Sequence, residues 1–506
     1  MRTTSRLHGI IAAAVIVVSA CSPTPSPSAS AVTSVPPSGT VTPAPSATAA
    51  PGPTATPEPT PSPTPAPPVF VPPVVTPATL PVETGTVLIT PGVEHGDVYV
   101  MVVQGSMFGG GPERTIVTHL DARGRTTAGW PVAIEGWSCS SAWGSNRPQG
   151  VLVGVDGIVR LLCVTSTNVP GSEPVLAAVA LGPDGTMPGG AWPMEIAGDW
   201  DTEAVLLGDT LVTGTSTRAS DDPQHPASTY RVTSVAADGT VTEGTPVTID
   251  LVSWSVLGRD GILRVMSDDN RTVTAIGLDG VVAGWPATFD LPVSGPAVRA
   301  DGTSVFVQAK AGKSRTVVVS ADGTIQGTGS AWLPVTQLAD WSGATPAGAT
   351  AIPLVAADGT AYLLGQRKIE MLVYGIGANG HVLPGFPVTV PWRLEADGRC
   401  NAADTGCGVW MVRPPVGRDA TVYLPVRPLD RRTGGWVTAL TRNGTVRDGW
   451  SLMLSGNGDS FSALAIGGSG ALFGVHVNRS SNPTIKQVWG IGASGAIRWK
   501  VTVVQP

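Results

Sequence analysis

Eight near-copies of one short phrase run through the last four-fifths of this chain and constrain its fold more than any other feature. Each copy is an apolar strand, a turn with glycine, a few polar residues and then Gly-Trp-Pro or a variant of it, as in LDARGRTTAGWPV (Leu120 to Val132). The turn glycines are 41 to 64 residues apart, a spacing typical of repeat architectures. They are Gly124, Gly185, Gly239, Gly280, Gly323, Gly380, Gly444 and Gly495.

A second series of hairpins, such as DGIVRLLCV and DGILRVMS, alternates with the first, so each unit contains four strands, A to D. The Asp-Gly and Asn-Gly turns supply the positive φ of tight hairpins. Proline cannot donate a hydrogen bond to a sheet ladder, so the proline of the phrase places strand D at the outer edge of each sheet. Regular four-stranded units with protected edges predict an all-β propeller of eight blades, with seven as the alternative count.

An aromatic residue precedes the proline at one fixed place in most copies. A large ring at such a place should pack against the neighbouring blade and hold the stack together. These residues are Trp130, Trp192, Trp285, Phe386 and Trp450, with Trp332 and Trp499 in variant copies and Thr245 as the exception.

The last copy, IGASGAIRWKV, resembles the tryptophan-docking repeat of the quinoprotein-like (PQQ-like) eight-bladed propellers. The resemblance covers about residues 84 to 506 and implies the fold. Quinoprotein dehydrogenases of that family use a pair of adjacent cysteines, a catalytic acid and a calcium ion. Because no two cysteines of this chain are adjacent, we expect no quinone cofactor. No metal is expected either.

The N-terminal region is typical of an exported protein. Residues 1–20 carry Arg2 and Arg6 ahead of an apolar stretch too short for an ordinary membrane helix, which indicates a signal peptide. The stretch ends in Val-Ser-Ala-Cys, which resembles the lipobox of bacterial lipoproteins and implies lipidation of Cys21. In an ordinary signal peptide Cys21 would be incidental.

The next segment, residues 21–81, is rich in proline, serine and threonine, a composition that predicts a disordered stalk. Residues 82–506 then form the propeller. We expect the protein to be lipid-anchored in the bacterial cell envelope, facing outside the cytoplasmic membrane. The anchor is its only expected contact with a membrane.

The first and last blades should each be built from one end of the chain. Strand D of the last blade ends at Val501 to Val504, and strand A of the first begins near Thr86, so the termini exchange no strand. The segment VFVPPVV (Val69 to Val75) is a candidate addition, but its paired prolines argue against it.

Four cysteines remain after Cys21, and an even number in an exported chain predicts disulfides. Cys400 and Cys407 bracket a short loop, and Cys139 and Cys163 belong to neighbouring strands, so we expect these two pairs. A metal site is the alternative, but no Cys-x-x-Cys occurs.

Variation between the copies is confined to the connections from strand B to C and from strand D to A, which leave the same end of the blades. We call this end the variable-loop face; its longest segments are WSCSSAWGSNRPQG (137–150), TSTRASDDPQHPAS (215–228) and PWRLEADGRCNAADTG (391–406). Varied loops on a rigid scaffold are where recognition is commonly found. Five tryptophans near these loops are candidate ligand-binding residues, with packing between blades as the alternative role. They are Trp137, Trp200, Trp254, Trp341 and Trp392.

The sequence therefore predicts a surface-tethered, non-enzymatic, monomeric module that binds an envelope or extracellular protein or glycan. The alternative is an extracellular polysaccharide lyase or hydrolase with a site in the propeller funnel. No G-x-S-x-G, H-E-x-x-H or Walker-type loop occurs, and five tyrosines and six histidines are little material for a catalytic cluster. A net charge of −6 with scattered basic residues argues against nucleic acid as a partner.

Overall fold

The computed structural model describes residues 70–505, except for residues 95, 106–112, 141–149, 166–174, 199–202, 219–226, 336, 339–352, 368–369, 391–413, 427–434, 455–458 and 479–483. The described residues belong to one compact unit, Pro67–Pro506. No helix among them is long and apolar enough to cross a membrane.

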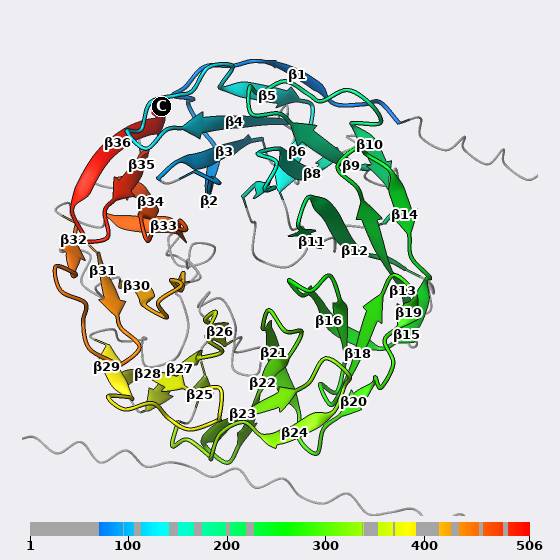
Figure 1. Cartoon of the computed structure of the whole chain (residues 1–506), viewed down its shortest axis with the longest axis vertical. Coiled ribbons are helices and arrows are strands. Elements are labelled where there is room, and N and C mark those ends of the chain that lie inside the picture. Colours follow the sequence, from blue (N-terminus) through cyan, green and yellow to red (C-terminus); the bar gives the residue numbers. More distant parts are fainter. Residues whose placement is uncertain are drawn as a thin grey trace, which may run out of the picture. The chain divides into compact units, whose positions relative to one another are not determined.

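Eight antiparallel sheets surround a central axis, which confirms the predicted eight-bladed propeller (Figure 1). Blade 1 contains β1 (Val74–Pro77), β2 (Thr86–Pro91), β3 (Val98–Gln104), β4 (Arg114–Leu120) and β5 (Val132–Glu135). Blade 2 contains β6 (Ser138–Ser140), β7 (Leu152–Val153), β8 (Val159–Thr165), β9 (Val175–Leu181) and β10 (Met194–Ile196). Blade 3 contains β11 (Glu203–Leu207), β12 (Thr210–Arg218), β13 (Ala227–Val235), β14 (Val241–Glu243) and β15 (Val247–Asp250). Blade 4 contains β16 (Val252–Leu257), β17 (Leu263–Ser267), β18 (Thr272–Gly277), β19 (Gly280–Val281) and β20 (Ala287–Thr288).

The second half of the ring repeats this plan with fewer split strands. Blade 5 contains β21 (Val293–Val298), β22 (Ser304–Lys310), β23 (Lys313–Val319) and β24 (Ile325–Thr328). Blade 6 contains β25 (Gln337–Leu338), β26 (Leu354–Val355), β27 (Ala361–Arg367), β28 (Glu370–Ile376) and β29 (Val388–Val390). Blade 7 contains β30 (Val422–Val426), β31 (Trp436–Leu440) and β32 (Leu452–Met453). Blade 8 contains β33 (Ser460–Ile466), β34 (Leu472–Asn478), β35 (Ile485–Ile491) and β36 (Ile497–Val504).

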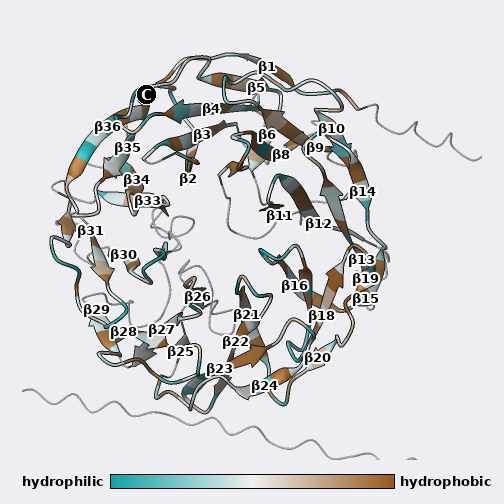
Figure 2. Cartoon of the chain, in the orientation of Figure 1, coloured by the Kyte–Doolittle hydropathy of each residue, from teal (hydrophilic) through white to brown (hydrophobic). Residues whose placement is uncertain are grey.

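The core lies between the blades rather than within one of them. The buried apolar residues of the described chain form eight clusters, one at each interface between neighbouring blades. Hydrophobic residues concentrate in middle strands such as β9, β18 and β22 (Figure 2). Each blade therefore depends on both neighbours to bury its two faces, as in other repeat architectures.

The predicted contact of the repeated aromatic with the next blade is confirmed. Five indole N–H groups donate a hydrogen bond to a backbone oxygen in the C–D turn of the following blade. The pairs are Trp130 to Pro183 (2.8 Å), Trp192 to Ala237 (3.2 Å), Trp285 to Ala321 (3.0 Å), Trp450 to Ala493 (2.8 Å) and Trp499 to Ala122 (3.0 Å). The last pair joins blade 8 to blade 1.

Trp332 does not occupy this docking place, contrary to expectation. In blade 5 the glycine that meets the next turn is Gly329, whose backbone packs against Gly380. Ser330 follows it where most of the other copies have tryptophan, and it is buried. Trp332 therefore lies two residues further along, nine residues after the turn glycine Gly323 instead of the four to seven found in the other copies.

A short N-terminal segment joins the two ends of the ring. β1 pairs with β5 on the outside of blade 1, and its Pro77 lies opposite Val132. Val82 then forms a parallel bridge with Val504 of blade 8, with its N–H 3.1 Å from the oxygen of Val503. VFVPPVV therefore enters the sheet only with its last two residues, Val74 and Val75, and its paired prolines precede β1. An outermost strand has one edge without a partner, so it tolerates proline.

The remaining expectations for the ring hold. No strand is exchanged between the termini, because blade 8 is built only from β33–β36. Strand D is the outermost strand of the other described sheets, and blade 1 is the exception because β1 covers β5.

Replacement of Trp285 by phenylalanine tests the docking bond. The Trp285→Phe variant should lose about 1–3 kcal/mol of unfolding free energy, because the Ala321 oxygen loses its donor at a mostly buried place. Urea titration followed by circular dichroism measures this loss. The matched control is Trp332→Phe, the same change at a tryptophan that does not dock. Equal losses in the two variants would contradict the docking role.

Candidate functional site

The two ends of the blades differ sharply in regularity. At one end, which we call the turn face, thirteen A–B and C–D hairpin turns close with the same backbone bond, from the N–H of one residue to the oxygen of the fourth residue after it, as in Gly154 to Ile158 and Gly182 to Thr186. At the variable-loop face, the connections between strands B and C range from two residues, between β22 and β23, to nine, between β3 and β4. Most structural variation is therefore at one end of the propeller, since on the turn face only the A–B turns of blades 1 and 3 and the C–D turn of blade 4 depart from the shared bond.

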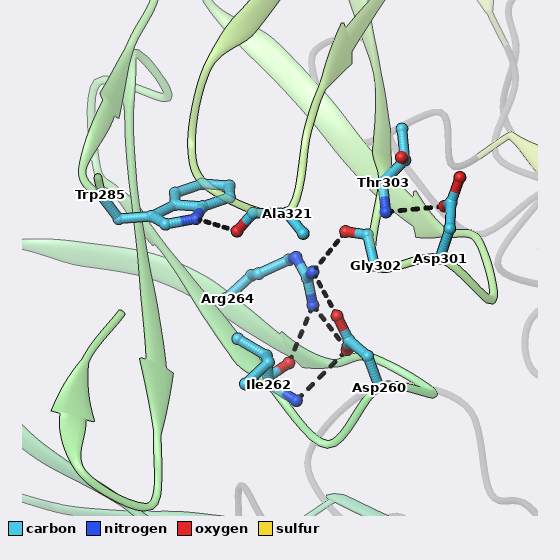
Figure 3. A network of polar contacts seen from close by, with 8 residues as sticks. All are labelled: Asp260, Ile262, Arg264, Trp285, Asp301, Gly302, Thr303 and Ala321. Atoms are coloured by element: carbon cyan, nitrogen blue, oxygen red, sulfur yellow. Dashed lines mark hydrogen bonds and ion pairs between the residues drawn. The ribbon is translucent and has the colours of Figure 1, made fainter. Parts of the chain in front are cut away.

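Polar side chains of the turn face are used in contacts between blades. Arg264 is buried and forms an ion pair with Asp260 of its own A–B turn, with an Nη2–Oδ2 distance of 2.7 Å (Figure 3). The same Nη2 donates to the oxygen of Gly302 in blade 5 at 3.0 Å. Arg299 repeats the contact one blade later, donating to Gly359. These residues form a second row of inter-blade contacts, next to the docking tryptophan of the same blade (Figure 3).

One polar chain on the turn face has the order of a hydrolase triad. Asp97 Oδ2 lies 2.9 Å from His119 Nε2, and Thr127 Oγ1 lies 3.1 Å from His119 Nδ1. Tyr99 stacks on the imidazole at 4.3 Å, and burial, with the charge of Asp97 in second place, raises the pKa of Tyr99 to about 12. Asp97 is buried and both ring nitrogens of His119 are engaged. The chain of contacts therefore ties the two turns of blade 1 together.

Two of the five candidate tryptophans lie within the described residues. Trp137 is buried in the cluster between blades 1 and 2, where its ring meets Phe70 edge to face at 6.2 Å. Trp254 is half-buried against the cluster between blades 4 and 5. The burial of Trp137 favours the packing alternative for that residue, whereas Trp254 is only half-buried and its ligand-binding role stays a prediction. Trp200, Trp341 and Trp392 lie outside the described residues, so their ligand-binding role stays a prediction.

The predicted Cys139–Cys163 disulfide is present. The two residues lie directly opposite each other on β6 and β8, and both are buried. It fixes the inner strand of blade 2 next to Trp137, at the root of a long segment of the variable-loop face. Cys21, Cys400 and Cys407 lie outside the described residues.

A polar cluster that the sequence analysis did not single out lies on the variable-loop face between blades 4 and 5. Gln308 is buried, and its Nε2 donates to Asp290 Oδ1 at 3.1 Å and to the oxygen of Leu291 at 3.0 Å. Its Oε1 accepts a bond from Arg315 Nε at 2.8 Å. The Arg315 guanidinium also lies over the Trp332 ring, 4.6 Å from its centroid. The hydrogen bond from Gln308, helped by the charge of Arg315, lowers the pKa of Asp290.

A signal for this cluster was available in the sequence. Trp332 lies too far from its turn glycine to make the docking contact with the next blade. An aromatic residue that does not make this contact can have another role. Arg315 and Gln308 are evenly spaced from the turn between β22 and β23 and so face each other across the hairpin.

Blade 8 carries a buried acid–histidine pair at the same end of the ring. His476 Nε2 lies 3.1 Å from Asp459 Oδ2, and the imidazole stacks on Trp489 at 4.2 Å. Burial lowers the pKa of His476; the charge of Asp459 opposes this shift, and Lys500 adds to it. Lys500 itself lies over the Trp489 ring at 3.9 Å. Because both members of the pair are buried, they support the interface between blades 7 and 8.

No group of three or more His, Cys, Asp and Glu side chains suitable for a metal ion occurs within the described parts of the chain. The polar groups that cluster there are engaged in turns, in contacts between blades, or in the open Gln308–Arg315–Trp332 arrangement. Of these, the last combines a partly exposed aromatic surface and cation with a buried amide that holds the cation.

No protein-family model matches the sequence, and no curated protein matches it. Among solved structures, the chain is similar to a quinoprotein alcohol dehydrogenase-like protein from Bacteroides thetaiotaomicron, at 12% identity over 85% of this chain and 96% of that one, with a TM-score of 0.36. It is also similar to a puromycin-hydrolyzing peptidase from Mycobacterium tuberculosis, at 13% identity over 85% and 57% of the two chains and a TM-score of 0.42. A streptogramin B lyase matches at 13% identity over 67% and 94%, with a TM-score of 0.33. At these identities the likeness concerns the propeller fold alone.

The buried histidine gives the protein a measurable pH dependence. We expect the unfolding free energy to fall as the pH drops below about 6.5, because the unfolded chain then binds a proton on His476 that the native state binds only at lower pH. The slope from this one group is at most about 1.4 kcal/mol per pH unit.

Urea titrations at about pH 7.5 and 5.5 measure this effect. The His476→Gln variant should show a smaller difference between the two pH values than the unmodified protein. The control variant His381→Gln, at an exposed turn, should retain the full difference. A His476→Gln variant with an unchanged pH dependence would contradict the assignment.

Proposed function

We propose that this protein is a surface-tethered, non-enzymatic binding module of the quinoprotein-like propeller class, which holds an extracellular or envelope protein or glycan on its variable-loop face. The single observation that carries the proposal is the contrast between the two ends of the blades. Thirteen turns at one end share one backbone bond, whereas the B–C connections at the other range from two to nine residues. Loops of varied length on a rigid support are the usual carriers of recognition.

The described part of that face contains contacts suited to binding. Trp332, Arg315 and Gln308 lie together at the mouth of the interface between blades 4 and 5. By contrast, the acid–histidine pair of blade 8 is buried, and in blade 1 Asp97 is buried while both ring nitrogens of His119 are already engaged. This difference favours a binder over the alternative, an extracellular polysaccharide lyase or hydrolase with a site in the funnel. Neither cofactor nor metal enters the proposal.

The proposed anchor is the lipidated Cys21, with the segment between it and the start of the compact unit at Pro67 as a stalk. This would place a monomeric propeller in the bacterial cell envelope, away from nucleic acid and joined to the membrane only by its lipid. The support is the sequence pattern of residues 1–21 and the composition of the stalk.

Binding to a glycan panel and to envelope extracts tests the function. A mature chain with Trp200→Ala and Trp341→Ala should bind at least about tenfold more weakly than the unmodified chain, since removing a buried aromatic contact costs 1.4 kcal/mol or more. Its thermal unfolding midpoint should be unchanged. Unchanged binding with a lowered midpoint would assign these residues to packing. Release of new reducing or unsaturated ends from any glycan would favour the enzyme alternative.

The anchor is tested separately by the Cys21→Ser variant. We expect this variant to leave the membrane fraction and to lose incorporation of labelled fatty acid. The neighbouring Ser22→Ala variant, which leaves the thiol in place, should behave like the unmodified chain. A Cys21→Ser protein that stays membrane-bound and labelled would refute the anchor.

A further inference from the structure

Two lysines face each other at the tip of blade 5 on the variable-loop face. β22 and β23 are joined by Ala311 and Gly312, which have positive φ values of 46° and 74°, as a two-residue hairpin turn of the favoured hand requires. Lys310 and Lys313 are therefore directly opposite each other. Both are exposed, and neither forms an ion pair with any described residue. Like charges directly opposite on a sheet repel, so an anion placed between them is favoured.

Arg315 lies on the same side of this hairpin, one row further from the tip. Gln308 lies opposite Arg315 in the ladder and fixes its Nε at 2.8 Å. Its Nη2 is 3.6 Å from Asp290 Oδ1, beyond hydrogen-bond distance. Guanidinium carries five N–H donors in a planar fork. The fork is thus held in place by its Nε while its Nη donors remain available for a carboxylate.

Trp332 completes the row on the outer strand. The bridge between Ser314 and Leu333 sets the register, so that Trp332 lies beside Arg315 in the same row. Its indole packs on the Arg315 guanidinium and is partly open to solvent. Because Ser330 fills the docking place in this blade, the ring makes no contact of the docking kind. One face of blade 5 therefore carries three cations next to an aromatic surface.

The local charge is unusual for this protein. The whole chain has a net charge of −6 and only five lysines, of which this turn contains two. The hairpin carries three positive charges, on Lys310, Lys313 and Arg315. The neighbouring Asp290 reduces the sum to +2. The B–C turn of blade 4 nearby adds Asp268, Asp269 and Arg271, for −1. Positive charge is thus concentrated at the tip of blade 5.

We propose that Lys310, Lys313, Arg315 and Trp332 bind an acidic glycan, with the buried Gln308 holding Arg315 in position. Sugar carboxylates, as in uronates, would lie on the three cations, and the apolar face of a sugar ring would lie against the indole. This inference rests on the proposed function, because it names the ligand class for one part of the variable-loop face. A polyanion without sugar rings would bind through the three cations alone and would not require the indole of Trp332.

The test measures binding of polygalacturonate to the full mature chain by calorimetry, with neutral dextran and poly-glutamate as comparison probes. The Lys310→Ala/Lys313→Ala double variant should raise the Kd for polygalacturonate at least tenfold, and so should Trp332→Ala. The matched control is Arg259→Ala/Arg418→Ala, which removes two exposed charges from the turn face. This control should leave the Kd within twofold, and dextran should not bind.

Each other outcome identifies a different error. Equal losses in the lysine and control variants would mean nonspecific charge attraction and would overturn the inference. Equal binding of poly-glutamate, with no effect of Trp332→Ala, would mean a protein-like polyanion and overturn the glycan. Absence of polygalacturonate binding, with envelope binding that still depends on Trp200 and Trp341, would overturn the inference alone. Absence of both would overturn the proposed function as well.

Discussion

A tryptophan N–H that reaches into the next blade is the contact on which this ring depends. A twisted sheet with two apolar faces buries neither of them alone, so each blade must be held in register against two neighbours. The indole does this because it combines a large apolar surface with one directional donor. Its acceptor is a backbone oxygen in a tight turn, which has a fixed position. Each such bond contributes only about 1 kcal/mol. Because it is repeated around the ring, it fixes the position of each of these blades relative to the next.

A second row of contacts supports the first where the sequence allows it. Arg264 and Tyr362 stand at the same place in strand B of blades 4 and 6, and each donates to the A–B turn of the next blade. Burial raises the pKa of Tyr362 well above its ordinary range, so this donor keeps its proton. The turn face therefore serves mainly to hold neighbouring blades together. Only the opposite end is free to vary without loosening the ring.

The features that sequence analysis predicted are those with a local physical cause. A turn glycine with positive φ and a proline that cannot donate a hydrogen bond predict a hairpin turn and an edge strand from a single copy. Eight copies support the same prediction. The features that it missed depend on partners far away in the chain. The pairing of β1 with β5 is set by an edge that exists only after blade 1 has formed. The spacing of Trp332 from Gly323 could be read in the sequence, but what fills the docking place in blade 5 depends on the contact of Gly329 with Gly380 in blade 6.

The candidate site was predictable to a lesser degree for the same reason. The choice of face followed from comparing the copies, but proximity to loops did not distinguish a ligand-facing ring from a packed one, and Trp137 is packed. The Gln308–Arg315 pair could have been read from its symmetric spacing about the turn between β22 and β23. Its significance required Trp332 beside it, and that followed from an irregularity in blade 5.

Closure of the ring has a consequence for how the chain is made. Val82 can form its bridge only after Val504 has been made. The turn at Ala122 likewise accepts its bond from Trp499, 377 residues later in the chain. A chain synthesised from its N-terminus therefore has one open face on blade 1 until the residues near Trp499 and Val504 are made. During that interval Val98, Val100 and Val102 lack the strands that cover them. Contacts of such separation form late. Strand β36 is thus the element that converts an open stack of sheets into a closed ring.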